Sequence, residues 1–485
     1  MIRLDNFKLD KDRDSNEIYL NLKKDIDEFT SQKEHKKYIE ELSKILNISN
    51  QIIDLKFKRL IYNDFNLNTA NFNNKYNFFK ISSQFLFFFI FLCFIKIFGK
   101  NNFVQKKFDI IVDEVDGIGQ FNKFYKIITK FKNPIIFTKN KNVQREVNNQ
   151  GIVAVRYNRI VPSKVLLKKK FFIIINFYLQ IFLKNVKIKE NYFIYYLRIL
   201  LSAIKNKTLF SKAISEIVLQ DRFYINCPIK NFFFKKNGGK KIISCQNHLA
   251  ESGICFYSDI DVLFSFGNEK KSEKKLRIFG SRIGGSLPVG SLAMERRYYI
   301  ESKKNLNESS EIDLLIIGIT PPHLNTSNKI YEGYYKYLKW IKDFSREKPE
   351  IKILYKHHAS FAGDLKEEEI FKSSNVKILL KGNTYSYFKK SKVLVSFGST
   401  MILEGLSLKK KCFFADPDNC LTTYYSYHEY DKNLFLNSYK DFCKNILSSL
   451  NSLETEKVNF DRMCLESGDV SDKIYSNIIK LKSRN

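Results

Sequence analysis

The residues best suited to hold an anion follow two apolar runs in the second half of the chain. Lys356, His357 and His358 come directly after the run 351–355, and Ser399 and Thr400 follow the β-branched run 393–396. Ammonium and imidazole groups, hydroxyls and the free N–H groups at a helix start are phosphate donors in proteins. The pattern favours a nucleotide site. The alternative is an ordinary strand-to-helix connection with a Ser/Thr cap.

Carboxylates complete this candidate chemistry. Glu404 lies one turn into a helix expected over residues 401–408, where it can accept hydrogen bonds from a ribose diol. In the first half, Asp113, Glu114 and Asp116 lie at the end of a strand expected over residues 108–115. A sugar hydroxyl needs a base within hydrogen-bond reach to become a good nucleophile, and a carboxylate can serve as that base.

Two further residues compete with Asp116 for the role of base. Asp221 follows a strand expected over residues 216–219, and His248 follows another apolar run, where it could act as base or phosphate ligand. Each of the three has an alternative role as an ordinary loop or cap residue. His357 and His358 could instead bind a metal, but no acidic or cysteine partner stands at ligand spacing nearby. We therefore expect neither a metal nor a cofactor.

Strands and helices alternate along the half of the chain that carries the predicted phosphate ligands. Apolar runs at residues 312–319, 351–356, 376–380 and 393–396 predict strands, and residues 330–346 show helical spacing. This alternation is typical of a doubly wound parallel sheet, in which ligands bind beyond the carboxyl ends of the strands. Residues 108–115 and 134–138 predict a βαβ unit in the first half.

These motifs resemble a known family over residues 217–450. A basic strand end with a histidine, a strand with a Ser/Thr turn and a helix containing Glu404 and Gly405 resemble the donor domain of GT-B glycosyltransferases. The similar enzymes build bacterial capsule and O-antigen or belong to the sialyl- and Kdo-transferase types. His357 stands at the family's histidine, and His358 replaces its proline. The segment 232–248 is similar to a Lys-Lys-x-Gly-Gly-Lys…Gln-His segment of surface-carbohydrate proteins, with an Asn interrupting the last pair.

The resemblance implies an α/β fold with two Rossmann-like domains facing a cleft and an extra helical N-terminal region. We expect a helical extension over residues 1–78, an acceptor-side domain over 79–290 and a nucleotide-sugar domain over 291–485. The implied activity is metal-independent transfer of a sugar to a membrane-linked surface-polysaccharide acceptor (capsule, O-antigen or lipopolysaccharide). The implied donor ligands are Lys356, His357, His358, Ser399, Thr400 and Glu404. A nucleotide-sugar epimerase of similar fold and a non-catalytic scaffold of a polysaccharide assembly complex are the alternatives.

The formal charge of +31 raises the question of an anionic partner. Aromatic residues lie in apolar segments instead of alternating with basic residues, so the sequence does not favour nucleic acid. An anionic membrane surface fits better. Residues 81–98 approach the length of about 20 residues that a membrane span needs, and residues 164–201 mix lysines with apolar faces as interfacial helices do. Burial of both segments in the first domain is the alternative.

Three smaller expectations concern location and connecting segments. Eight scattered cysteines and a polar N-terminus predict a cytoplasmic protein, peripheral to or anchored in the inner membrane. Alternating charges over residues 33–46 predict an exposed helix that could serve as a coiled-coil or lid element. The Gly- and Ser-rich residues 280–295 predict a hinge loop between the two domains.

Overall fold

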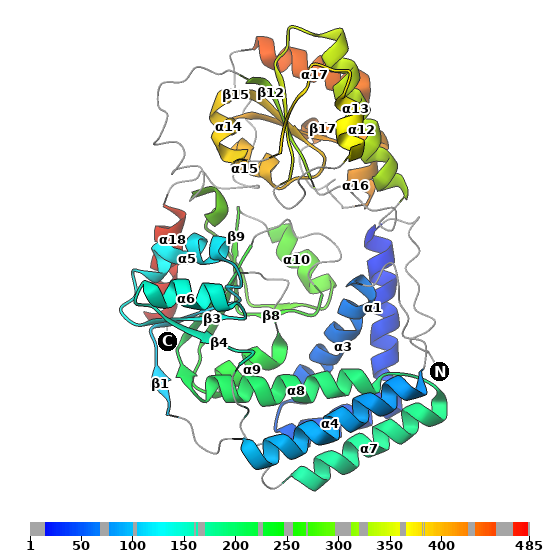
Figure 1. Cartoon of the computed structure of the whole chain (residues 1–485), viewed down its shortest axis with the longest axis vertical. Coiled ribbons are helices and arrows are strands. Elements are labelled where there is room, and N and C mark those ends of the chain that lie inside the picture. The colour runs from blue at the N-terminus through cyan, green and yellow to red at the C-terminus, as the bar shows by residue number, and fades with distance from the viewer. Residues whose placement is uncertain are drawn as a thin grey trace.

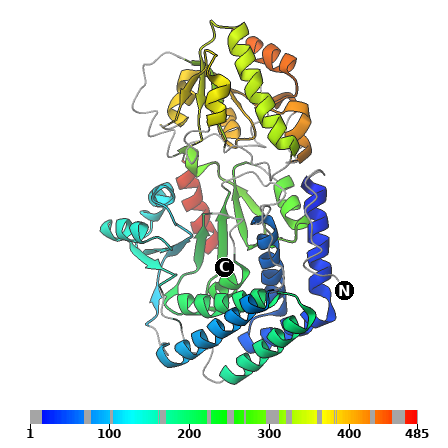
Figure 2. The same cartoon turned by 45° about the vertical axis from the view of Figure 1, so that its right-hand side comes forward.

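The described residues form two large parallel sheets, each flanked by helices (Figure 1). The computed structural model describes residues 15–67, 77–99, 104–159, 162, 170–221, 227–246, 256–267, 270–295, 312–319, 328–358, 365–380, 382, 384–424, 432–452 and 469–483. Figures 1 and 2 both place the second sheet at one end of the molecule and helices α4 and α7 at the opposite end.

The first sheet has seven parallel strands. In spatial order they are β11 (Ser286–Pro288), β9 (Val262–Ser265), β7 (Lys241–Cys245), β6 (Ile217–Gln220), β2 (Ile110–Asp113), β3 (Pro134–Thr138) and β4 (Val153–Arg156). Read from β4 and numbered along the chain, this order is 3-2-1-4-5-6-7, which extends the Rossmann order by one strand. Two short pairs accompany it, β1 (Lys106–Lys107) with β5 (Ala213–Ile214) and β8 (Asp259–Ile260) with β10 (Arg282–Ile283).

The second sheet has six parallel strands in the Rossmann order 3-2-1-4-5-6. They are β14 (Lys377–Leu379), β13 (Ile353–Lys356), β12 (Ile312–Ile317), β15 (Ser391–Ser396), β16 (Lys411–Ala415) and β17 (Phe435–Leu436). Its helices are α12 (Asn328–Glu347), α13 (Leu365–Phe371), α14 (Thr384–Lys390), α15 (Met401–Ser407), α16 (Cys420–Tyr424) and α17 (Tyr439–Asn451). The expected α/β class with two Rossmann-like domains is confirmed.

Apolar strand residues divide the core around the first sheet into two clusters, because alternate side chains point to opposite faces. One cluster joins the sheet to α5 (Ile118–Ile128), α6 (Lys141–Asn149) and α18 (Val470–Ser483). The other joins it to α8 (Phe193–Phe210), α9 (Pro228–Lys236), α10 (Lys270–Ile278) and the N-terminal helices. The last described helix, α18, therefore packs on the first sheet although it follows the second sheet in sequence. The three predicted domain ranges stay predictions.

Two connecting segments differ from expectation. Helix α2 (Lys33–Leu46), expected to be exposed, keeps its charged face exposed but packs against α1 (Ser15–Ser31) and α3 (Asn50–Leu67) and buries His35, Tyr38 and Leu42. The predicted hinge loop over 280–295 forms β10 and β11 before it reaches the second unit. In both segments, apolar side chains pack into the core, although the charge pattern of one and the glycine pattern of the other did not predict it.

Two helices among the described residues are long and apolar enough to cross a membrane. They are α4 (Phe78–Phe98) and α7 (Phe171–Ile188). Both also pack against α8. Length and composition alone do not separate a spanning helix from one that packs on a soluble domain.

Candidate functional site

The predicted phosphate ligands lie at one edge of the second sheet. Ile317, the last residue of β12, is paired with Lys356 at the end of β13 on one side and with Ser396 at the end of β15 on the other. His357 and Phe397 therefore leave the same edge on either side of β12. Two inter-strand spacings separate their backbones by roughly 10 Å. The strand order reverses between β12 and β15, and such a switch point is where Rossmann-like sheets bind ligands.

His357 is held by a carboxylate from a neighbouring helix. Its Nδ1 atom lies 2.8 Å from the Oε2 atom of Glu367 on α13, and both side chains are almost fully buried. The Tyr334 hydroxyl on α12 donates to the other oxygen of Glu367 and lies 3.1 Å from the hydroxyl of Tyr355. Three elements therefore fix one ring nitrogen of the histidine in place.

The opposite nitrogen of this ring has no such contact. The Nε2 atom of His357 is buried and has no hydrogen-bond partner among the residues that the structure describes. A buried polar atom without a partner costs free energy, so native proteins rarely leave one unless a ligand, ion or water completes it. A histidine fixed by a carboxylate at one nitrogen and uncommitted at the other is an oriented ligand-binding group.

Backbone packing explains why a glycine stands next to this histidine. Gly318 follows β12, and a Cβ atom added to it would lie 2.7 Å from the carbonyl oxygen of Lys356 and 3.2 Å from the Cα atom of His357. The chain after β12 can approach β13 so closely only without a side chain. Gly318 therefore positions the segment that carries His357.

The two residues on either side of His357 have different roles. The Lys356 ammonium is buried and donates to the carbonyl oxygens of His357 (2.8 Å) and Leu380 (3.5 Å). Burial lowers the pKa of Lys356. Partial loss of solvation and the nearby Lys356 charge also lower the pKa of His358, although its side chain reaches the surface. Lys356 therefore braces the backbone of the site, and His358 lies at its surface.

The hydroxyls and the carboxylate after β15 are also partly committed. The Oγ atom of Ser399 accepts from the N–H of Met401 (3.3 Å), and Thr400 precedes α15 without a side-chain cap. Glu404 is buried, and its two oxygens accept from the hydroxyls of Ser291 (2.6 Å) and Tyr385 (2.5 Å). Glu404 thus ties the segment that leaves the first sheet to the second unit. A ribose bound by Glu404 would share these donors or displace them.

The predicted acids of the first half lie at the switch point of the first sheet. Asp113 at the end of β2 pairs in register with Gln220 at the end of β6, so Asp221 follows at the same edge. Asp221 is buried and already accepts from Gln120 (2.6 Å) and Lys123 on α5. Asp116 is about one-third exposed and accepts from the N–H of Lys139 (2.7 Å). His248 lies outside the described residues.

Glu114 is the most unusual acid at this edge. It is buried, and its φ of 65° lies in the left-handed region that a residue with a Cβ atom rarely adopts. Lys230 on α9 pairs with Asp113 and lies 3.6 Å from one oxygen of Glu114. The other oxygen, Oε2, has no hydrogen-bond partner within the described part of the chain.

The surroundings of Glu114 keep its carboxyl protonated at pH values well above the range in which a glutamate usually loses its proton. Burial raises the pKa of Glu114 to about 8; Lys230 works against this rise, and the Asp113 charge adds to it. A carboxyl that titrates near neutral pH can take up and release protons under physiological conditions. The sequence named Glu114 as an acid at a strand end, but nothing in it signals a left-handed backbone.

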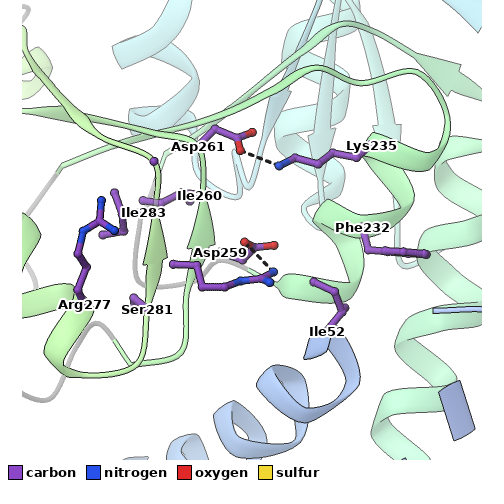
Figure 3. Close-up of a pocket in the computed structure, with 11 residues that line it drawn as sticks. Ile52, Phe232, Lys235, Asp259, Ile260, Asp261, Arg277, Ser281 and Ile283 are labelled. Carbon is purple, nitrogen blue, oxygen red and sulfur yellow. Dashed lines mark hydrogen bonds and ion pairs between the residues drawn. The ribbon is translucent and has the colours of Figure 1, made fainter. Parts of the chain in front are cut away.

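A pocket of about 560 Å³ lies elsewhere, between α3, α9 and the β8–β10 pair (Figure 3). None of the predicted site residues lines it. Its Lys235 lies 2.6 Å from Asp261, and its Arg282 lies 2.9 Å from Asp259. These charges are neutralised within the chain, so the pocket is a weaker candidate than the sheet edges. The described residues also contain no cluster of three or more His, Cys, Asp or Glu suited to a metal ion.

Comparison with known proteins finds distant similarity only. No family model matches the chain, and no curated protein matches it. Among solved structures, the chain is similar to the wall teichoic acid polymerase TagF at 14% identity, covering 84% of this chain and 98% of that chain with a TM-score of 0.44. It is also similar to a UDP-GlcNAc 2-epimerase from Neisseria meningitidis at 10% identity, covering 78% of this chain and 100% of that chain with a TM-score of 0.42. A glycosyltransferase from Rickettsia africae is similar at 11% identity, covering 77% of this chain and 99% of that chain with a TM-score of 0.41. The fold therefore rests on the strand order of the chain's own two sheets.

Proposed function

We propose that this chain is a glycosyltransferase that moves a sugar from a nucleotide-sugar donor to a surface-polysaccharide acceptor carried on a membrane. The observation that supports it best is the oriented His357, whose buried Nε2 atom has no partner in the described structure, at the ligand-binding edge of a Rossmann-like sheet. When both ring nitrogens carry a proton, Nδ1 faces Glu367 and Nε2 can donate to a phosphate oxygen of the donor.

The proposed chemistry needs the leaving phosphate to be stabilised as its bond to the sugar breaks. A fixed N–H donor in a buried site stabilises developing negative charge without reorganisation, which is the advantage of an imidazole held by Glu367. Ser399, Thr400 and the exposed His358 complete the proposed phosphate contacts, and Glu404 is the proposed ribose ligand. Lys356 contributes by holding the backbone at His357.

The base for the acceptor hydroxyl is proposed to come from the first unit. Of the two described aspartates in the predicted set, Asp116 is the more exposed and lies 3.6 Å from the Lys139 ammonium, whereas Asp221 is buried and pairs with Lys123. Glu114 joins them as a candidate because its carboxyl titrates near neutral pH. His248 remains a predicted base or phosphate ligand.

Nucleotide-induced thermal shift tests the phosphate role directly. The wild type is titrated with CMP, CDP, UDP and GDP, and we expect at least one of them to raise the Tm. His357→Ala should weaken binding of that nucleotide by roughly 10- to 100-fold, because a charge-assisted hydrogen bond is lost. His357→Gln, which can place an amide N–H near the position of Nε2, should recover part of the affinity.

A matched pair of variants on α13 separates the orientation of the His357 ring by Glu367 from a general effect of removing one negative charge. Glu367→Gln should also weaken nucleotide binding, because the imidazole loses its carboxylate partner. Glu369→Gln removes the same charge from an exposed position two residues away and should bind as the wild type does. Wild-type nucleotide binding and transfer kinetics in His357→Ala would remove the phosphate role. Conversion of a nucleotide-sugar to its epimer without any acceptor would favour the epimerase alternative.

A further inference from the structure

Helix α4 is apolar on two opposite sides, and only one of them is covered by protein. Ile81, Phe88, Leu92 and Ile95 are buried on the covered side. Phe79, Leu86, Phe87, Ile90, Phe94 and Ile97 are 51–82% exposed. Apart from the adjacent pair Leu86 and Phe87, successive members are three, four or seven residues apart, which places them along one broad face of the helix. An apolar stripe of this length on a soluble surface marks an interaction site.

Helix α7 extends this surface. The two helices lie side by side at one end of the molecule (Figures 1 and 2), where the rings of Phe85 and Phe182 are 4.7 Å apart and Lys96 lies over the ring of Phe171. Phe172 and Leu183 of α7 are 75% and 57% exposed. Because α4 and α7 both pack against α8, their exposed apolar residues lie on the side away from α8. We call this surface the α4–α7 face.

The charges on these helices indicate what covers the face. Lys80, Lys96 and Lys187 are exposed on α4 and α7, which contain no Asp or Glu, whereas Lys184 pairs with Glu34 of α2. Lysines beside an exposed apolar stripe are the pattern that binds anionic headgroups while the aromatic rings enter the acyl boundary. A second copy of the chain would bring the same lysines, with no acid on these helices to pair with them, and would itself carry a formal charge of +31.

The packing of α4 also decides how it meets a bilayer. Its covered side is buried from Ile81 to Ile95, nearly its whole length, against a domain that includes α8. On α8, Arg198 forms an ion pair with Asp64 at 2.8 Å. A transmembrane α4 would draw this charged helix toward the hydrocarbon, at high cost. A helix with one side fixed to protein and the other side apolar is suited to lie in the plane of the interface.

We propose that the α4–α7 face docks on a bilayer containing anionic phospholipid, with both helices lying in the plane of the interface and neither spanning it. The inference gives the membrane partner of the proposed function a specific binding surface. Docking here would hold the end of the molecule opposite the second sheet against the lipid (Figure 1).

Vesicle flotation of the full chain tests the proposal without any donor or acceptor, so this inference and the proposed function can fail independently. The wild type should float with vesicles of phosphatidylcholine and phosphatidylglycerol in equal parts and less with phosphatidylcholine alone. A triple variant, Phe87→Ser, Ile90→Ser and Phe94→Ser, should lower partitioning into the mixed vesicles at least about tenfold, because three apolar side chains no longer enter the interface.

A matched control replaces the same number of exposed apolar residues on other surfaces. Leu20→Ser, Val153→Ser and Ile479→Ser, at positions 41–45% exposed, should float as the wild type does. Both triple variants should keep the wild-type circular dichroism spectrum. Equal flotation of the wild type and the α4 variant would overturn the proposal, as would a wild type that ignores both vesicle types. Sedimentation showing a wild-type dimer that becomes a monomer only in the α4 variant would assign the face to a second copy.

Discussion

A single carboxyl group, Glu114, stands out at the edge of the first sheet. It combines burial, a left-handed backbone and an oxygen without a hydrogen-bond partner in the described structure. Each of these features costs free energy, and proteins retain such strain mainly at functional sites. The neighbouring Asp113 is equally buried, and Lys230 lies closer to it than to Glu114. Glu114 differs from Asp113 in its left-handed backbone.

The raised pKa of Glu114 predicts a specific pH dependence of stability. The folded pKa of about 8 exceeds the unfolded value of 4.5, so the folded state holds the proton longer. The contribution to stability is complete below about pH 4.5 and is lost as pH rises toward 8, by at most roughly 1.4 kcal/mol per pH unit. Glu114→Gln, which mimics the protonated carboxyl, should lack this loss. Chemical denaturation of both proteins at several pH values between about 5 and 8 measures it.

The sign of the difference is the decisive result. The two proteins should be similarly stable near pH 5, and the variant should become the more stable one as pH approaches 8. Parallel pH profiles for the two proteins would mean that Glu114 is ionised at neutral pH in the folded state. Asp116→Asn, at a more exposed acid two residues away, serves as the control and should leave the slope unchanged.

At this scale the sequence predicted residue types better than their partners. His357 and Ser399 were recognisable because chemistry at the ends of parallel strands is local in sequence. Glu367 and Tyr334, which orient His357, come from two separate helices and match no spacing rule. Because such contacts exist only after the sheet and its helices pack together, no local pattern could have revealed them.

Close packing between strand ends governs the site at the level of elements. Gly318 lets the segment after β12 pass the carbonyl of Lys356, and an added Cβ atom would lie 2.7 Å from that oxygen. Gly318→Ala should therefore cost about 1–3 kcal/mol in unfolding free energy, because backbone must shift to accept the methyl group. It should also weaken nucleotide binding, since His357 belongs to the displaced segment. Denaturant unfolding and the thermal shift with nucleotide give the two readouts.

Another glycine provides the matched control for this substitution. A Cβ atom added to Gly285, which precedes β11, would meet nothing within 4 Å. Gly285→Ala should change the unfolding free energy by no more than about 0.5 kcal/mol and leave nucleotide binding intact. Equal effects of the two substitutions would show that the close approach at Gly318 does not constrain the site.

The predicted elements were reliable where the pattern of apolar residues was uninterrupted. The strand expected over residues 134–138 coincides with β3, and the helix over 330–346 lies within α12. The charged face of α2 is exposed as predicted, but the pattern of charges gave no indication that the apolar stripe including Tyr38, Ile39 and Leu42 is buried. Burial depends on whether another element covers a stripe, and that is decided by tertiary packing.

The two Rossmann-like units of the whole molecule are joined by contacts from both directions along the chain. Ser291 leaves the first sheet and donates to Glu404 in the second unit. Helix α18, which follows the second sheet in sequence, packs on α5 of the first unit. At its start, the N–H and Oγ of Ser471 donate to Glu295. Two crossing segments restrict how the units can move relative to each other. The sequence placed α18 in the second half but carried no sign of its return.

The position of α18 leads to a prediction about the stability of the first unit. Ile474 is fully buried in the core beneath the first sheet, whereas Ile479 on the same helix is 41% exposed. Ile474→Ala should cost about 2–4 kcal/mol in unfolding free energy, because it leaves a cavity against α5, and Ile479→Ala should cost no more than about 0.5 kcal/mol. Amide hydrogen exchange should show the lost protection in β2 and β3, not in β12 and β13. Loss of protection confined to the second sheet would mean that α18 stabilises the second unit and not the first. The packing of α18 on α5 would then not couple the two units.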